Sequence, residues 1–314
     1  TPRHQQGDIR RMNWKKFFTS PAPTTAWLLD GDSVAAVRRD GDGSLHCAVE
    51  AMPQGTCDVG PVGLQAVDRD RLSAVLGAVQ GRIDGARRPA VVVPTGWVRT
   101  QLFHFTDLPR RQSELDQVVR WRLKKLLPVL PSELRVSAIP HRSVDGQKPL
   151  LCMVGVERAI ASLEASFSAG GVDPGLISPR LFALANGIDG GRQLVVQQEE
   201  GYLSLLLAVD GVPRLVRTKP LAGGVGVEPV VQRELQLAHR FIRSDLGVTG
   251  EISVVVSAEN TSVQDESTRW WRDQDGFRLA PAADLPPMVD PEIATRLGEA
   301  RLIPMLRLAQ GVDR

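Results

Sequence analysis

The sequence predicts an α/β protein in which one structural unit is duplicated to give two lobes. Residues 26–50 and residues 193–217 share a pattern of three short apolar runs separated by polar turns. Asp42-Gly43 in the first unit and Asp210-Gly211 in the second indicate hairpin turns, because Asp-Gly pairs adopt the backbone angles that tight turns require. A helical pattern and a further apolar strand follow each unit. We therefore expect two sheets of similar build within one chain.

The remaining elements follow from periodicity and from capping residues. Apolar residues recur every three or four positions, as in helices, in residues 70–79, 157–168, 181–186, 229–243 and 292–310. Short apolar runs that predict strands are residues 90–93, 150–156 and 252–256. Gly170-Gly171 ends the second of these helices with a common C-terminal cap, and Pro304 interrupts the last.

One more helix, predicted from Glu114 to Leu127, has a basic face with a central tryptophan. Its apolar face is formed by Leu115, Val118, Val119, Leu123, Leu126 and Leu127. Its other face carries Arg120, Trp121, Arg122, Lys124 and Lys125. Pro128 cannot continue the helix. Such a face is either a solvated surface or a partner-binding surface, and the spacing alone favours the solvated surface.

Composition limits the class of protein. The 314 residues are 42% hydrophobic and 24% charged, which is ordinary for a soluble globular protein, and the net charge of +2 argues against nucleic-acid binding by bulk electrostatics. Cys47, Cys57 and Cys152 are too few and too scattered for a disulfide framework or a metal site, and the five histidines have no ligand spacing. No apolar run is long enough to span a bilayer. We expect a cytoplasmic protein that binds no metal and no nucleic acid.

Residues 1–23 differ from the rest of the chain in their charge. Five basic residues, Arg3, Arg10, Arg11, Lys15 and Lys16, stand there against Asp8. We expect a flexible basic tail, with a weak contact to an anionic membrane surface as the alternative.

Three groups of residues carry a resemblance to a known family. The first is Leu108-Pro109, Glu114-Leu115, Trp121 and Pro128 in the helical insertion. The second is residues 169–172 followed by residues 182–185, and the third is Asp210-Gly211, Pro213, Arg217, Pro220 and Gly223. Over about residues 24–312 the chain resembles the PilM family of type IV pilus assembly proteins. The resemblance implies an actin-like fold, a ribonuclease H-like duplication of two lobes with an insertion in the first lobe.

The chain departs from the actin-like ATPases at each element that would hold ATP. These enzymes use two Asp-x-Gly turns for the phosphates, but Leu28 and Asp30 stand at the Asp and Gly positions of the first turn. Gln197 and Glu199 stand at those positions of the second turn, and the adenosine turn, residues 257–260, has no glycine. Carboxylates aimed at a triphosphate repel it. We therefore expect a pseudo-ATPase with no cofactor and no catalytic residue.

The resemblance also predicts the domain boundaries. The first lobe is expected at residues 24–102 and 179–192, with the insertion at residues 103–178 between these two parts. Residues 193–314 are expected to form a reduced second lobe, because the few residues before the helix at 229–243 leave no room for the subdomain that the family inserts there.

The function that the resemblance implies is that of a scaffold. PilM proteins capture the N-terminal cytoplasmic tail of a PilN-like bitopic inner-membrane protein, so this chain would associate peripherally with the membrane through that partner. The partner-binding residues are predicted to be Trp121, Arg122, Lys125 and Leu126, in a groove between the first lobe and its insertion. The assembly motor ATPase is a second candidate partner. A GspL-like component of a type II secretion system and an actin-like ATPase are the alternatives.

Overall fold

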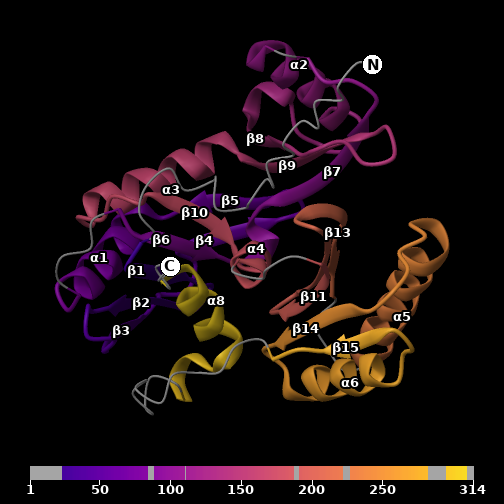
Figure 1. Cartoon of the computed structure of the whole chain (residues 1–314). Coiled ribbons are helices and arrows are strands. Elements are labelled where there is room, and N and C mark those ends of the chain that lie inside the picture. The colour runs from indigo at the N-terminus through magenta and orange to yellow at the C-terminus, as the bar shows by residue number, and fades with distance from the viewer. Residues whose placement is uncertain are drawn as a thin grey trace, which may run out of the picture.

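The structure, a computed structural model, describes residues 23–83, 88–109, 111–186, 191–221, 227–281 and 295–309. Within these residues the chain forms two five-stranded sheets, and a three-stranded and a two-stranded sheet lie beside the first of them (Figure 1). The predicted basic tail, residues 1–23, lies outside the described residues except for Pro23.

The first sheet is built around β1 (Thr25–Leu29), whose five residues are all buried. Its strand order is β10-β6-β1-β2-β3, with the other strands at Leu176–Pro179, Ala90–Val93, Ser33–Arg39 and Leu45–Ala51. Because side chains alternate between the two faces of a strand, a strand buried throughout must be covered on both sides. The helices α1 (Arg69–Gln80) and α3 (Glu157–Ala169) cover one face, and α8 (Glu299–Ala309) covers the other.

The second sheet repeats this order as β13-β12-β11-β14-β15. Its strands are β11 (Arg192–Glu199), β12 (Tyr202–Val209), β13 (Val212–Pro220), β14 (Ile252–Ala258) and β15 (Phe277–Leu279). The helices α5 (Val227–Arg240), extended by a π-helical turn at Phe241–Asp245, and α6 (Thr261–Arg272) cover one face. The short helix α4 (Arg180–Ala185) packs on the other face together with Ile303 of α8. The matching order of the two sheets confirms the predicted duplication.

The insertion has a small core of its own. Its sheet has the order β7-β9-β8, with strands Arg99–Phe105, Lys148–Val156 and Leu134–Pro140, and α2 (Gln112–Leu123) packs on it through Leu115, Val119 and Leu123. In Figure 1, α2 lies at the end of the molecule away from both five-stranded sheets. A hairpin of β4 (Cys57–Gly60) and β5 (Gly63–Val67) lies below it. Gly63 has φ +101° and an added Cβ would lie 2.2 Å from the carbonyl oxygen of Trp97, so only glycine fits there.

Two predicted domain boundaries need correction. The insertion was expected at residues 103–178, but α3 packs in the core of the first lobe and β10 is a strand of the first sheet, so the insertion spans β7 to β9. Residues 193–314 were all expected in the second lobe, but α8 returns to the first lobe, where Leu302, Met305 and Leu306 pack against Leu28 of β1. Both segments return because the apolar strands of the first sheet need cover on each face.

The second lobe is reduced as predicted, since only residues 221–226 lie between β13 and α5. None of the helices in the described part of the chain has the length and apolar character needed to cross a membrane.

Candidate functional site

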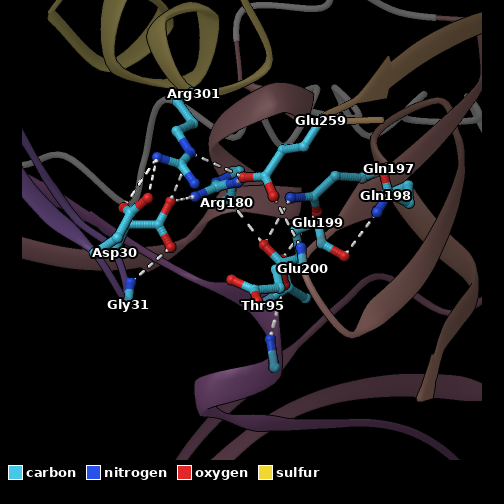
Figure 2. Close-up of polar contacts among 12 residues, drawn as sticks. Asp30, Gly31, Thr95, Arg180, Gln197, Gln198, Glu199, Glu200, Glu259 and Arg301 are labelled. Atoms are coloured by element: carbon cyan, nitrogen blue, oxygen red, sulfur yellow. Dashed lines mark hydrogen bonds and ion pairs between the residues drawn. The ribbon is translucent and has the colours of Figure 1, made fainter. Parts of the chain in front are cut away.

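Three carboxylates from the two lobes meet around one arginine between the sheets (Figure 2). Asp30 follows β1 in the first lobe, while Glu199 ends β11 and Glu259 follows β14 in the second. β11 and β14 are parallel neighbours with Gln198 opposite Ala258, so their carboxyl ends bring Glu199 and Glu259 to the same edge of the sheet. Arg180, the first residue of α4, lies between them with 1% of its surface exposed. We call Asp30, Arg180, Glu199, Glu259 and Arg301 the interlobe cluster.

Arg180 and Arg301 share the carboxylates of the interlobe cluster. Arg180 Nη2 lies 2.5 Å from Asp30 Oδ2, its Nη1 contacts Glu259 Oε1, and its Nε lies 3.8 Å from Glu199 Oε2. Arg301 of α8 places its Nε 3.1 Å from Asp30 Oδ2 and 3.2 Å from Glu259 Oε1. Each arginine therefore bridges the first-lobe carboxylate to a second-lobe carboxylate.

Two further hydrogen bonds join the lobes beside this cluster. Thr95 Oγ1 donates to Gln197 Oε1 at 2.9 Å, and the backbone N–H of Gly96 donates to Glu199 Oε1 at 2.9 Å. An added Cβ at Gly96 would lie 2.3 Å from the ring of Tyr202, so the backbone of one lobe packs directly on a side chain of the other. These contacts fix the turn after β6 against the turn after β11.

Burial and the arginines set the charges of the cluster. Burial raises the pKa of Glu199 to about 7, against the attraction of Arg180, so this carboxyl titrates near neutral pH. Burial also opposes the ionisation of Glu259, but Arg180 and Arg301 outweigh it and lower the pKa of Glu259. The carboxylates in turn raise the pKa of Arg180 against its own desolvation. The cluster is therefore an internally compensated set of charges.

A cavity of about 810 Å³ adjoins the cluster between β14, α6 and α8. Residues 257–260, where the family resemblance places the adenosine turn, contribute Ser257, Ala258 and Glu259 to its lining, and Arg301 lines it from α8. A molecule in this cavity would meet the Glu259–Arg301 ion pair rather than a glycine-containing adenosine turn. Among the described residues, no group of three or more His, Cys, Asp or Glu side chains has the geometry of a metal site.

The predicted partner-binding residues lie on α2 and on the turn that follows it, far from the cluster. Trp121 is 60% exposed and Leu126 53%, and Lys125 Nζ lies 4.3 Å from the centroid of the Trp121 ring. Arg122 points toward the insertion sheet instead, with its guanidinium 4.7 Å from the centroid of the Phe105 ring. Leu130, in the segment that follows α2, is also 63% exposed and was not among the predicted partner-binding residues. We call Trp121, Lys125, Leu126 and Leu130 the α2 surface.

The α2 surface does not form the predicted groove wall against the first lobe. α2 packs on the insertion through its apolar face, in one cluster with β7, β8 and β9. The exposed side chains lie on the outside of this small domain. A tail bound there would lie on an open face.

The chain matches no protein-family model and no curated protein. Among solved structures it is similar to a chain of a PilM–PilN type IV pilus biogenesis complex, with a TM-score of 0.68 and 16% identity over 94% of this chain and 100% of that one. The fold is actin-like. It is also similar to the cytoplasmic domain of EpsL, an inner-membrane component of the type II secretion system of Vibrio cholerae, with a TM-score of 0.50 and 9% identity over 91% of this chain and 93% of that one.

These similarities establish the architecture, and they confirm the resemblance to PilM that the sequence predicts at the level of the fold. The interlobe cluster contains Asp30 and Glu199, the positions at which the sequence resemblance places the two phosphate turns. Both turns were identified in the sequence through Asp30 and Glu199. Arg180 and Arg301 were not, because no sequence pattern relates an arginine at the start of α4 or in α8 to Asp30, which lies more than a hundred residues from both in the chain.

Proposed function

We propose that this protein is a scaffold of a type IV pilus-type inner-membrane assembly complex and that its nucleotide site is degenerate. The degenerate nucleotide site is inferred from the position of Arg180. Its buried guanidinium lies between the two turns at which the resemblance places the phosphates. A triphosphate would have to displace it and would then face Asp30, Glu199 and Glu259. Each of these carboxylates is already paired with Arg180, so we infer that the chain is a pseudo-ATPase.

The partner we propose is the N-terminal cytoplasmic tail of a PilN-like membrane protein. This proposal is supported by the likeness in fold to a chain from a PilM–PilN complex and by the exposure of the α2 surface. An exposed tryptophan with a neighbouring leucine is the kind of anchor that dominates protein interfaces, and Lys125 supplies charge for an acidic or amide side chain of the tail. Through this tail the protein would lie at the cytoplasmic face of the inner membrane, with the assembly motor ATPase as a second partner.

The alternative is a GspL-like role in a type II secretion system. The similarity to the EpsL cytoplasmic domain favours it, although with a lower TM-score than the PilM–PilN structure. Binding of a PilN-like tail peptide supports the pilus role. Binding of a cytoplasmic segment from a secretion-system membrane protein, with no binding of the PilN-like peptide, supports the alternative.

Substitutions in the α2 surface and at the neighbouring Arg122, which packs over Phe105, test the proposed tail site. Trp121→Ala should weaken binding of a PilN-like N-terminal peptide by about 1–3 kcal/mol, because it removes an exposed aromatic anchor, and Arg122→Glu should weaken it similarly by reversing a nearby charge. The binding is measured by calorimetry on the full chain, with folding checked by circular dichroism. Arg158→Glu, an exposed substitution on α3, is the matched control and should leave the affinity unchanged. If Trp121→Ala and Arg122→Glu both fold and bind unchanged, the tail binds elsewhere.

A further inference from the structure

The helix α5 has apolar side chains on two faces, and the core uses only one of them. The face against the second sheet consists of Val231, Leu235, Ala238 and, in the π-helical turn, Ile242. Three further side chains are exposed: Val230 at 40%, Leu237 at 39% and Phe241 at 37%. Their spacing of seven and then four residues places them along one line of the helix. We call Val230, Leu237 and Phe241 the α5 stripe.

The helix α5, which carries the α5 stripe, lies at the side of the second lobe away from α2 (Figure 1). Glu234 lies between Val230 and Leu237 in the same line, but it is 5% exposed and is paired with two residues of the edge strand β13. Its Oε2 lies 2.7 Å from Arg217 Nη2 and its Oε1 lies 3.8 Å from Lys219 Nζ. The charge within the stripe is therefore already compensated inside the molecule, and the apolar side chains remain uncovered.

Basic side chains flank the α5 stripe on both sides. Arg233 and Arg240, seven residues apart and both exposed, follow one flank along the helix. Arg217 and Lys219 line the other flank, because they reach Glu234 from β13. The second acidic residue of α5, Glu228, accepts a hydrogen bond from Ser262 Oγ of α6 at 3.1 Å and so lies on another side of the helix.

We propose that the α5 stripe is a docking surface for an acidic amphipathic helix of another protein. The stripe has apolar residues seven and then four positions apart, with arginines at heptad spacing beside them, and such a pattern allows a second helix to pack along α5. The apolar side chains of the stripe give the partner helix a surface to pack against. Arg233 and Arg240 select Glu or Asp at the flanking positions of the partner. This surface is separate from the α2 surface, so the inference does not depend on where a membrane-protein tail binds.

A second copy of this chain fits the α5 stripe less well than an acidic helix does. If two α5 helices packed antiparallel along their stripes, the flanking arginines of one copy would face those of the other. Like charges in such positions disfavour pairing. The charges therefore favour a partner of opposite sign.

A designed peptide probe tests the proposal on the full chain. The probe is an amphipathic helix of about three heptads with Leu at the seam and Glu at the flanking positions, and its control carries Lys in place of each Glu. Fluorescence anisotropy should show the Glu peptide binding at least about tenfold more tightly than the Lys peptide. The double variant Arg233→Glu with Arg240→Glu should reverse that preference. Leu237→Gln should weaken the binding of both peptides. The matched control, Arg69→Glu with Arg158→Glu on α1 and α3, should retain the wild-type preference.

Three outcomes would overturn the proposal. In the first, the folded wild-type protein shows no preference between the peptides, or the double variant keeps the wild-type preference. In the second, the wild type dimerises in sedimentation velocity and Leu237→Gln does not, which assigns the stripe to a second copy. In the third, the wild type binds phosphatidylglycerol vesicles through Arg233 and Arg240 but not the Glu peptide, which assigns it to a lipid surface.

Discussion

At the scale of single residues, Arg180 determines what the space between the lobes can hold. A guanidinium that is 1% exposed is stable only if its charge is compensated, and Asp30, Glu199 and Glu259 do this. The same contacts leave no site for an external anion. One side chain thus joins carboxylates of both lobes.

Replacing Arg180 with an uncharged side chain should strongly destabilise the fold. Arg180→Met keeps most of the volume but leaves buried carboxylates without their main counter-charge, so we expect a loss of about 3–5 kcal/mol in the free energy of unfolding. Urea denaturation followed by circular dichroism measures it. Arg158→Met, on the exposed side of α3, is the control and should change the free energy by less than about 0.5 kcal/mol. A loss below about 1 kcal/mol for Arg180→Met would show that the cluster does not hold the lobes together.

Glu199 should make the stability depend on pH near neutrality. Burial raises its pKa in the folded state to about 7 from the ordinary value of 4.5, so the folded protein binds a proton that the unfolded chain releases. This contribution to the unfolding free energy is complete below pH 4.5 and is lost as the pH rises toward 7. Glu199→Gln imitates the neutral carboxyl and cannot titrate. The stability difference between wild type and variant should therefore change between pH 5 and pH 8, and a constant difference would contradict the assignment.

At the scale of secondary structure, the sequence predicted the elements well where periodicity and turns agree. Both β-meanders, the helices α1 and α3 and the strands β6 and β14 lie at the predicted positions, because short apolar runs and the Asp-Gly turns between them indicate the same elements. The helix predicted to end at Leu127 ends at Leu123 instead. The backbone N–H of Leu126 bonds to the carbonyl of Leu123 at 2.9 Å, which tightens the last turn, and Leu127 precedes a proline and so avoids the helical conformation.

The two apolar faces of α5 predict opposite responses to the same substitution. Leu235 is completely buried in the second-lobe core, so Leu235→Ala should lower the free energy of unfolding by about 2–5 kcal/mol. Leu237, two residues on, is 39% exposed, so Leu237→Ala should cost less than about 1 kcal/mol. Chemical denaturation of both variants checks this. Equal losses would mean that Leu237 packs in the monomer and is not available to a partner.

At the scale of the whole molecule, the sequence predicted two lobes and an insertion but not how the lobes are joined. The turns with Asp30 and Glu199 were recognisable because each ends a predicted strand. Their partners were not, because α4 and α8 reach the cluster only through the tertiary structure, and α8 was assigned to the wrong lobe. Contacts between residues far apart in the chain leave no local periodicity, so sequence patterns do not reveal them.

The joined lobes should stay closed without any nucleotide. In an actin-like fold a ligand between the lobes can hold them together, but here Arg180, Arg301 and the packing of Gly96 on Tyr202 already do so. Mg-ATP should therefore give no calorimetric signal of micromolar binding and leave the radius of gyration from small-angle X-ray scattering unchanged. A ligand shifts a conformational equilibrium only by its differential affinity for the two states, and a blocked phosphate site gives none.

The Arg180→Met variant should show a larger radius of gyration while Arg158→Met matches the wild type. Micromolar binding of Mg-ATP to the wild type, with a contraction of the molecule, would refute the proposal that the chain is a pseudo-ATPase. It would indicate instead that a nucleotide closes the lobes.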